Sequence, residues 1–213
     1  MKQSPWLLVV CAAATVCCTG TGKCAPCAAD SVGVPPHDYY YNYVEDAFLG
    51  QAIGQTFYAP DTLVASVRVY VNQCSPEGIQ LFVAATKPDS IHTPITRHVL
   101  YAPPGQIPPC LPDRRIEWVF DPPLRLPGVG WYAFFVQAQF CNSEDYYLQA
   151  NQGGDLYPGG RVWWTNTAPT ICYLPDVYYS WADQAMFFWV VFCKDAVTPT
   201  VRHTWGGLKL LYR

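Results

Sequence analysis

The sequence is poor in charge, in helical periodicity and in long apolar runs. Charged residues make up 14% of the 213 residues and the net charge is −3, so the chain lacks the basic surface with which proteins neutralise nucleic-acid phosphates. No stretch keeps a helical period over three turns, which disfavours a helical enzyme. No apolar run reaches the about 20 residues that a spanning helix needs, which predicts no transmembrane segment in the mature chain.

Recognisable catalytic motifs are also lacking. The four histidines are far apart, and neither a His-Glu-x-x-His helix nor a Gly-x-Ser-x-Gly turn occurs. A carboxylate pair for glycoside hydrolysis stays an alternative, because its members can be distant in sequence. The candidates are Glu117, Glu144, Asp145, Asp155, Asp176 and Asp183. Since carboxylates in β-domains mostly lie in turns and at strand ends, we expect that this chain is not an enzyme.

Cysteine, proline and aromatic residues, by contrast, are abundant, with 10 Cys, 20 Pro, 15 Tyr and 8 Trp. Ten cysteines do not suit a reducing cytosol unless they bind metal, and their wide spacing does not suit a zinc knuckle. The pattern therefore predicts disulfides in an exported protein. Five cysteines precede residue 30, and the other five are Cys74, Cys110, Cys141, Cys172 and Cys193. Spacing does not select their pairing, and the odd member is free, pairs with the N-terminal segment, or pairs between chains.

The N-terminus is typical of a signal peptide. Lys2 precedes the apolar run of residues 6–16, which predicts a signal peptide over residues 1–22 and a linker over residues 23–45. Cys17 and Cys18 follow the apolar run closely, so a lipoprotein is an alternative. Cys24 and Cys27 form a CxxC pair, but no βαβ pattern surrounds it. We interpret these two as leader or linker cysteines.

From residue 46 to residue 194 the chain alternates short apolar runs with Pro, Gly, Asn and Asp, which is the pattern of strands and turns. The expected strands cover residues 52–59, 62–73, 78–85, 96–102, 115–120, 131–140, 146–150, 161–164 and 186–193. They are enough for two antiparallel sheets packed face to face. The sequence therefore predicts an all-β fold, a two-sheet antiparallel β-sandwich.

Alternation also predicts which side chains point inward. The last expected strand, residues 186–193, is almost continuously apolar, so we expect it to be central and buried on both faces. A turn is expected at Pro122-Pro123. The expected inward residues are Leu63, Ala65, Val67, Val69 and Val71; Ile79, Leu81 and Val83; and Ile116, Trp118 and Phe120.

Four short motifs follow one another along this domain: residues 54–60 (GQTFYAP); the strand pair 66–71 and 79–84; residues 118–132; and residues 155–160 followed by 183–187. In this order, from about Gly50 to Cys193, they resemble a family of exported bacterial β-sandwich surface modules of the choice-of-anchor type. The resemblance implies a jelly-roll-like sandwich on the cell surface or in secreted proteins, mostly without known activity.

Residues 195–213 change character. Residues 197–200 (VTPT) are typical of an extended linker, and the following residues 203–213 mix basic, aromatic and aliphatic side chains. This ending resembles the short tails of many exported proteins from environmental bacteria, which implies a sorting or anchoring tail. A last strand or a short helix packed on the domain is the alternative.

Aromatic side chains are dense between residues 146 and 181, among Asn, Gln and Asp. Sugars stack their C–H faces on Trp and Tyr and bond polar groups through hydroxyls, so this composition predicts a carbohydrate site. Trp163 and Trp164 must point to opposite faces, so at most one joins the core. The predicted ligand-binding residues are Tyr147, Asn151, Asp155, Tyr157, Trp163, Trp164 and Trp181. The alternative is that these rings fill the core and cover loops.

A structural Ca²⁺ site is a further prediction, since jelly-rolls often staple long loops with this ion. Asp155 and Asp183 are its candidates because they occupy the aspartate-bearing turns of the resembling family. The sequence as a whole favours a non-catalytic secreted or cell-surface binding or adhesion module, whose partner is a glycan or an envelope protein. A structural protein of an envelope or extracellular assembly, with protein contacts alone, is the alternative.

Overall fold

The computed structural model describes residues 29–36, 42–47, 51–72, 79–102, 108–138, 146–152, 156–166 and 173–193. Every regular element in these ranges is a strand, so none of the described residues form a helix that is long and apolar enough to cross a membrane. The strands are β1 (Ala29–Val34), β2 (Asn42–Ala47), β3 (Ala52–Ala59), β4 (Leu63–Tyr70), β5 (Ile79–Thr86), β6 (Pro94–Tyr101), β7 (Arg115–Arg125), β8 (Gly130–Ala138), β9 (Tyr146–Gln152), β10 (Val162–Thr165), β11 (Val177–Trp181), β12 (Gln184–Met186) and β13 (Phe188–Cys193).

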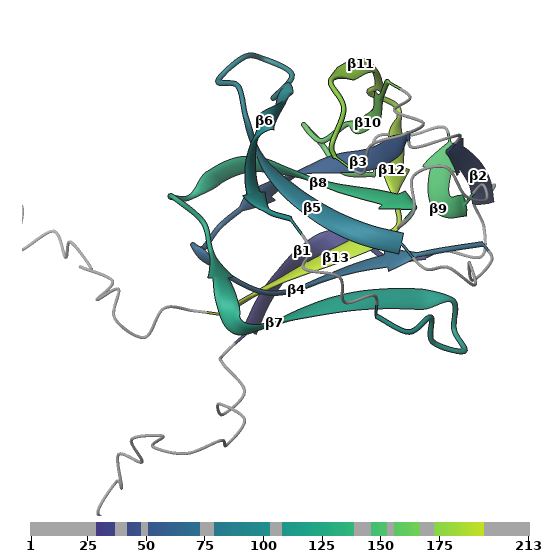
Figure 1. Ribbon diagram of the computed structural model, residues 1–213, viewed down its shortest axis with the longest axis horizontal. Helices are drawn as coiled ribbons and strands as arrows, with labels where there is room; N and C mark the ends of the chain where they lie inside the picture. Colours follow the sequence, from purple (N-terminus) through teal and green to yellow (C-terminus); the bar gives the residue numbers. More distant parts are fainter. Residues whose placement is uncertain are drawn as a thin grey trace, which may run out of the picture.

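The strands form two facing sheets and a smaller third one. A four-stranded sheet has the order β1-β13-β4-β7, a six-stranded sheet has the order β11-β10-β3-β8-β5-β6, and β12-β9-β2 form a three-stranded sheet. The six-stranded sheet lies above the four-stranded one, and the small sheet lies at one end of both (Figure 1). All pairings between named strands are antiparallel. The predicted all-β, antiparallel β-sandwich is confirmed.

The main core lies between these two sheets. The ring of Phe57 on β3 lies 6.2 Å from that of Phe134 on β8 and 6.4 Å from that of Phe192 on β13. Phe134 in turn lies 5.3 Å from Phe188. Aromatic pairs at these separations add about 0.5–1.5 kcal/mol each to the burial of their surface. Rings from both sheets therefore hold the two layers together.

The six-stranded sheet is covered on its outer face as well. A second buried cluster lies there, consisting of Ala52, Phe82, Ala84, Ala133, Phe135, Trp163 and Leu174. Every residue from Tyr132 to Ala138 on β8 is consequently buried. Gly54 on β3 allows this packing, because a Cβ atom there would overlap the carbonyl oxygen of Phe134 and the ring of Phe135.

Several sequence expectations about facing are confirmed, and one is wrong in part. Ile79, Leu81 and Val83 point into the main core, as do the expected residues of β7. In β4, however, Val64 is buried while Leu63 and Ala65 are half-buried. A register shift against β7 lies between Val64 and Ser66. This irregularity reverses the alternation at the start of the strand.

The expected last strand, residues 186–193, was wrong as one element. The run breaks at Phe187, so β12 joins the three-stranded sheet while β13 joins the four-stranded sheet. β13 is central, between β1 and β4, but Trp189 and Val191 are only half-buried. The chain crosses from one sheet to another here, and an apolar run alone does not reveal such a crossing.

Three strands lie where none was expected. β1 and β2 fall in the predicted linker of residues 23–45 and its border, and β11 lies at the end of the aromatic region of residues 146–181. β1 has little apolar alternation, but it pairs with all of β13. Gly33 fits there because a Cβ would overlap the backbone of Phe188. The expected turn at Pro122-Pro123 lies inside β7, which Pro tolerates because β7 ends the strand order of its sheet.

Candidate functional site

The structure distributes the predicted ligand-binding residues over several places. Trp164 and Trp181 come together, with ring centroids 5.9 Å apart. Trp163 points to the opposite face from Trp164 and lies in the outer buried cluster, so both Trp residues are buried. Tyr157 lies near the start of β8 instead. Tyr147 and Asn151 lie on β9, and Asp155 lies outside the described residues.

The first aromatic group is the β11 aromatic cluster, in which the exposed Tyr178 and Trp181 and the half-buried Tyr179 gather around the buried Trp164. The rings of Trp164 and Tyr179 are stacked at 4.7 Å, and Tyr178 meets Tyr179 edge-on at 4.2 Å. The register between β10 and β11 shifts between Trp164 and Thr165. This bulge places two consecutive tyrosines opposite one residue. Tyr178 and Trp181 remain 54% and 37% exposed.

The second group surrounds a hollow that we call the Trp131 pocket. It has a volume of about 620 Å³ and is lined by Lys87, Asp89, His92, Ile95, His98, Val129 and Trp131, among others. The rings of His92 and Trp131 are nearly parallel, with centroids 4.3 Å apart. The hollow therefore has an aromatic wall, apolar patches and several polar side chains, within the usual size range of small-molecule sites.

Trp131 is held in place from its other sides by two tyrosines. Tyr58 and Tyr157 meet its ring edge-on, at centroid distances of 5.7 and 6.3 Å. The backbone N–H of Tyr58 donates to the hydroxyl of Tyr157 at 3.0 Å. Burial raises the pKa of Tyr157, and the bond from Tyr58 offsets this in part. Tyr157 thus belongs to the predicted set and supports the wall of this pocket.

The turn that carries His92 is tightly hydrogen-bonded. The N–H of Lys87 donates to the carbonyl of Thr93 at 2.8 Å, and the N–H of Thr93 donates to the carboxylate of Asp89 at 2.9 Å. Hydrogen bonds from the side chain and the backbone of Thr93 lower the pKa of Asp89. His92 has a positive φ of 53°, which a non-glycine residue rarely adopts without local support. The turn therefore sets the position of the imidazole over Trp131.

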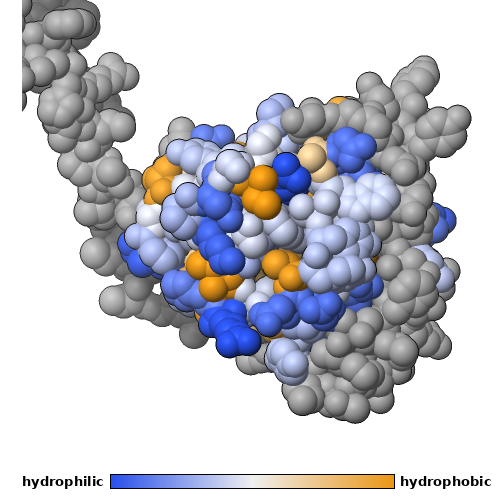
Figure 2. Space-filling view, turned by 90° about the horizontal axis from the view of Figure 1, so that it is seen from above, coloured by the Kyte–Doolittle hydropathy of each residue, from blue (hydrophilic) through white to orange (hydrophobic). Residues whose placement is uncertain are grey.

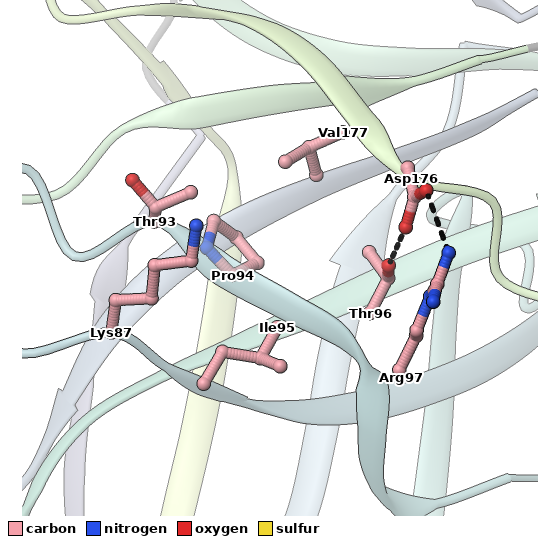
Figure 3. A pocket seen from close by; sticks show the side chains of 8 residues that line it. All are labelled: Lys87, Thr93, Pro94, Ile95, Thr96, Arg97, Asp176 and Val177. Atoms are coloured by element: carbon pink, nitrogen blue, oxygen red, sulfur yellow. Dashed lines mark hydrogen bonds and ion pairs between the residues drawn. The ribbon is translucent and has the colours of Figure 1, made fainter.

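Two smaller hollows lie along β6. The first, of about 280 Å³, is drawn in Figure 3, where Asp176 meets Thr96 and Arg97 on one side and Lys87 lies across from them. Asp176 accepts a hydrogen bond from the Thr96 hydroxyl at 3.0 Å and forms an ion pair with Arg97 at 3.5 Å. The second hollow, of about 410 Å³, shares these three residues and ends at Tyr173.

Among the described carboxylates, the hydrolase candidates have partners or lie in the open. Glu117 accepts two hydrogen bonds from Arg68 and one from Ser66. Burial lowers the pKa of Arg68, but the bonds and charge of Glu117 outweigh it and raise that pKa. Asp176 pairs with Arg97 and Asp183 is exposed. Glu144, Asp145 and Asp155 lie outside the described residues.

The calcium prediction has only one candidate in the described part of the chain. Asp183 lies between β11 and β12 and is exposed. Within the described ranges, no three His, Cys, Asp or Glu residues gather as a metal site would require. Since Asp155 lies outside those ranges, the site stays a prediction, and a chelator that lowers the melting temperature would support it.

Sequence reasoning missed the Trp131 pocket. Trp131 was expected in a strand, but nothing near it in sequence distinguishes it from a core residue. Its partners Tyr58, His92 and Tyr157 come from three distant segments. The one local pattern near the pocket was the turn before β6. The composition of that turn does not predict that the His92 imidazole lies over the Trp131 ring. Similarity to known proteins does not identify the site either, since no family model matches the chain and no curated protein matches it significantly.

Proposed function

We propose that this chain is a non-catalytic binding module, exported to the cell surface or the medium, and that it binds carbohydrate in the Trp131 pocket. Export is favoured by the signal-peptide pattern, by the many cysteines and by the resemblance to exported surface modules. The observation that carries the ligand class is the Trp131 wall, which stands beside Lys87, Asp89 and His98 in one hollow.

A sugar needs both an apolar surface and hydrogen-bonding groups. The exposed Val129 and the part of the Trp131 ring that His92 leaves uncovered offer the first. The lining also offers donors on Lys87 and the histidines and an acceptor on Asp89. On the face of the molecule seen in Figure 2, the coloured apolar residues stand apart among polar ones. A broad apolar partner surface would need contiguous apolar residues.

Binding without hydrolysis is favoured by the acids of the pocket. Among the described residues that line it, Asp89 is the one acidic residue, and its carboxylate already accepts from Thr93. Glycoside hydrolysis usually needs two carboxyl groups about 5 to 9.5 Å apart. A single engaged carboxylate suits recognition of hydroxyl groups.

The test is a glycan array with the purified protein, followed by titration of each hit with detection by tryptophan fluorescence. We expect saturable binding that quenches fluorescence and that falls at least about tenfold in Trp131→Phe and His92→Ala proteins. Trp181→Phe, in the β11 aromatic cluster, is the matched control and should bind normally. A hit that Trp131→Phe and His92→Ala leave unchanged would place the ligand elsewhere, and a silent array would count against carbohydrate.

A structural role in an envelope or extracellular assembly is the second candidate. It is favoured by the exposed rings of Tyr178 and Trp181 on β11, which ends the strand order of the six-stranded sheet. Exposed aromatic residues are enriched where proteins meet. In that case a Tyr178→Ser, Trp181→Ser protein would lose its cross-links to cell-surface proteins and keep any glycan binding.

The predicted disulfides belong to the same proposal. We propose that Cys110 and Cys193 both form disulfides. Cys193 is the register partner of Leu63 at the start of β4. Cys110 precedes Leu111, whose N–H donates to the carbonyl of Arg115. Arg115 is the register partner of Tyr70 at the other end of β4. The two ends of β4 are about 23 Å apart, far more than a disulfide spans. Each of the two cysteines therefore needs a different partner, outside the described residues.

A further inference from the structure

We infer that the ligand is a neutral linear glycan, bound through several of its sugar units along β6; this inference rests on the carbohydrate binding proposed above. The reason is that the three hollows adjoin one another. The Trp131 pocket and the hollow of Figure 3 share Lys87 and Ile95. The hollow of Figure 3 and the one ending at Tyr173 share Thr96, Arg97 and Asp176.

An irregularity of β6 accounts for this row of hollows. From Pro94 to Val99 the strand advances five residues, while its partner β5 advances two, from Thr86 to Ala84. The extra residues bow away from the sheet. The neighbours Thr96 and Arg97 consequently both reach Asp176, which regular alternation would prevent.

The row is long and has an aromatic ring at each end. Trp131 and Gln137 are separated by about 20 Å along β8, and the side chain of Gln137 bonds Tyr173. Trp131 and Tyr173 line the two outer hollows. Tyr173 is 50% exposed, and its carbonyl accepts from the side chain of Gln137 at 3.1 Å. Two separated rings with polar groups between them suit a chain of sugars more than a single one.

The charges along the row favour a neutral chain. Lys87 and Arg97 are balanced by Asp89 and Asp176, so a polyanion would gain little attraction. An extended peptide would bind most readily by continuing the sheet with even hydrogen bonds. The register shifts of β6 disrupt the even spacing that this needs.

The test is calorimetric titration of the protein with neutral oligosaccharides of two lengths. The probes are the hexasaccharides and disaccharides of the cellulose, xylan, laminarin and mannan series. For at least one series we expect the hexasaccharide to bind about tenfold or more tightly than the disaccharide, because the longer chain reaches further contacts. A galacturonic acid hexamer and a Ser-Thr repeat hexapeptide serve as the anionic and peptide probes.

Three variants locate the contacts. Arg97→Ala and Tyr173→Ala should weaken hexasaccharide binding about fivefold or more. They should change disaccharide binding less than about twofold, since neither residue lines the Trp131 pocket. Arg97 and Asp176 are exposed, and such pairs contribute at most about 1 kcal/mol to stability, so the Arg97→Ala protein should fold. Tyr178→Ala, an exposed tyrosine outside the row, is the matched control and should bind as the unaltered protein does.

The outcomes separate the two proposals. Equal affinity for both lengths, or hexasaccharide binding that neither Arg97→Ala nor Tyr173→Ala weakens, overturns the linear-chain inference and leaves carbohydrate binding in place. Tighter binding of the galacturonic acid hexamer or of the peptide overturns it as well. If none of the neutral probes binds while the glycan array gives hits, the linear-chain inference alone is wrong. A silent array together with silent titrations overturns both.

Discussion

The packing of β3 against β8 can be tested at a single glycine. Gly54 on β3 pairs with Phe135 on β8 and with Trp163 on β10. A Cβ added at Gly54 would overlap the carbonyl oxygen of Phe134 and the ring of Phe135, both completely buried. The ring can turn only into the outer cluster, and the carbonyl can move only if β8 moves with it.

We expect Gly54→Ala to lower the free energy of unfolding by about 1 to 2.5 kcal/mol. Overpacking a buried site costs about 1 to 3 kcal/mol, and this overlap should cost the upper part of that range because it involves backbone. The smaller conformational entropy of unfolded alanine offsets only about 0.4 to 1 kcal/mol. For a domain of this size the net loss corresponds to a fall in melting temperature of about 2 to 10 °C.

The assay is urea unfolding followed by tryptophan fluorescence, with Gly128→Ala as the matched control. No heavy atom lies within 4 Å of a Cβ built at Gly128, so that protein should be as stable as the original or slightly more stable. If the two variants differ by less than about 0.5 kcal/mol, β3 and β8 are not packed under the outer cluster as described.

Three further predictions concern hydrogen bonds, pH and cysteines. Thr165→Val should lower the free energy of unfolding by about 1 to 3 kcal/mol, because the buried Thr165 hydroxyl accepts from the N–H of Ala52 at 2.8 Å and that donor would lose its partner. Thr165→Ser keeps the hydroxyl and should therefore unfold at a higher urea concentration than Thr165→Val. The reverse order would contradict this prediction. Burial raises the pKa of Tyr157, so its phenol stays protonated in the folded protein above the ordinary pKa of about 10, and the protein loses stability as the pH rises through that range. When the free energy of unfolding is measured from pH 9 to about 11.5, it should fall less steeply with pH in Tyr157→Phe. An unchanged pH dependence would show that Tyr157 is not a cause of the loss. Iodoacetamide applied without reductant should leave Cys110 and Cys193 unmodified, and non-reducing peptide mapping should link each to a different cysteine; a peptide joining the two would contradict the strand register.

Local alternation was enough to predict much of the sandwich. The strand expected over residues 52–59 is β3 as observed, and Ile79 and Trp118 point inward as expected. These predictions succeed because the direction of a side chain along a strand is a property of neighbouring residues. The opposite directions of Trp163 and Trp164 follow in the same way, although the covered outer face that buries Trp163 was not predictable.

Where pairing partners decide the outcome, the sequence was not enough. The bulges in β4, β6 and β11 depend on the strands beside them, and a bulge changes which side chains share a face. β1 was missed because its pairing with β13 stabilises it more than its own composition does.

The candidate site shows the same division most clearly. The sequence by itself determined that the chain is an all-β sandwich with many aromatic residues, because composition and alternation are local. Only the tertiary structure decided that Trp131, His92 and Tyr157 meet beside one hollow, while Trp164 and Trp181 join a different cluster. Segments distant in the chain come together through strand pairing and sheet packing, and the contacts that make a binding site arise from that pairing.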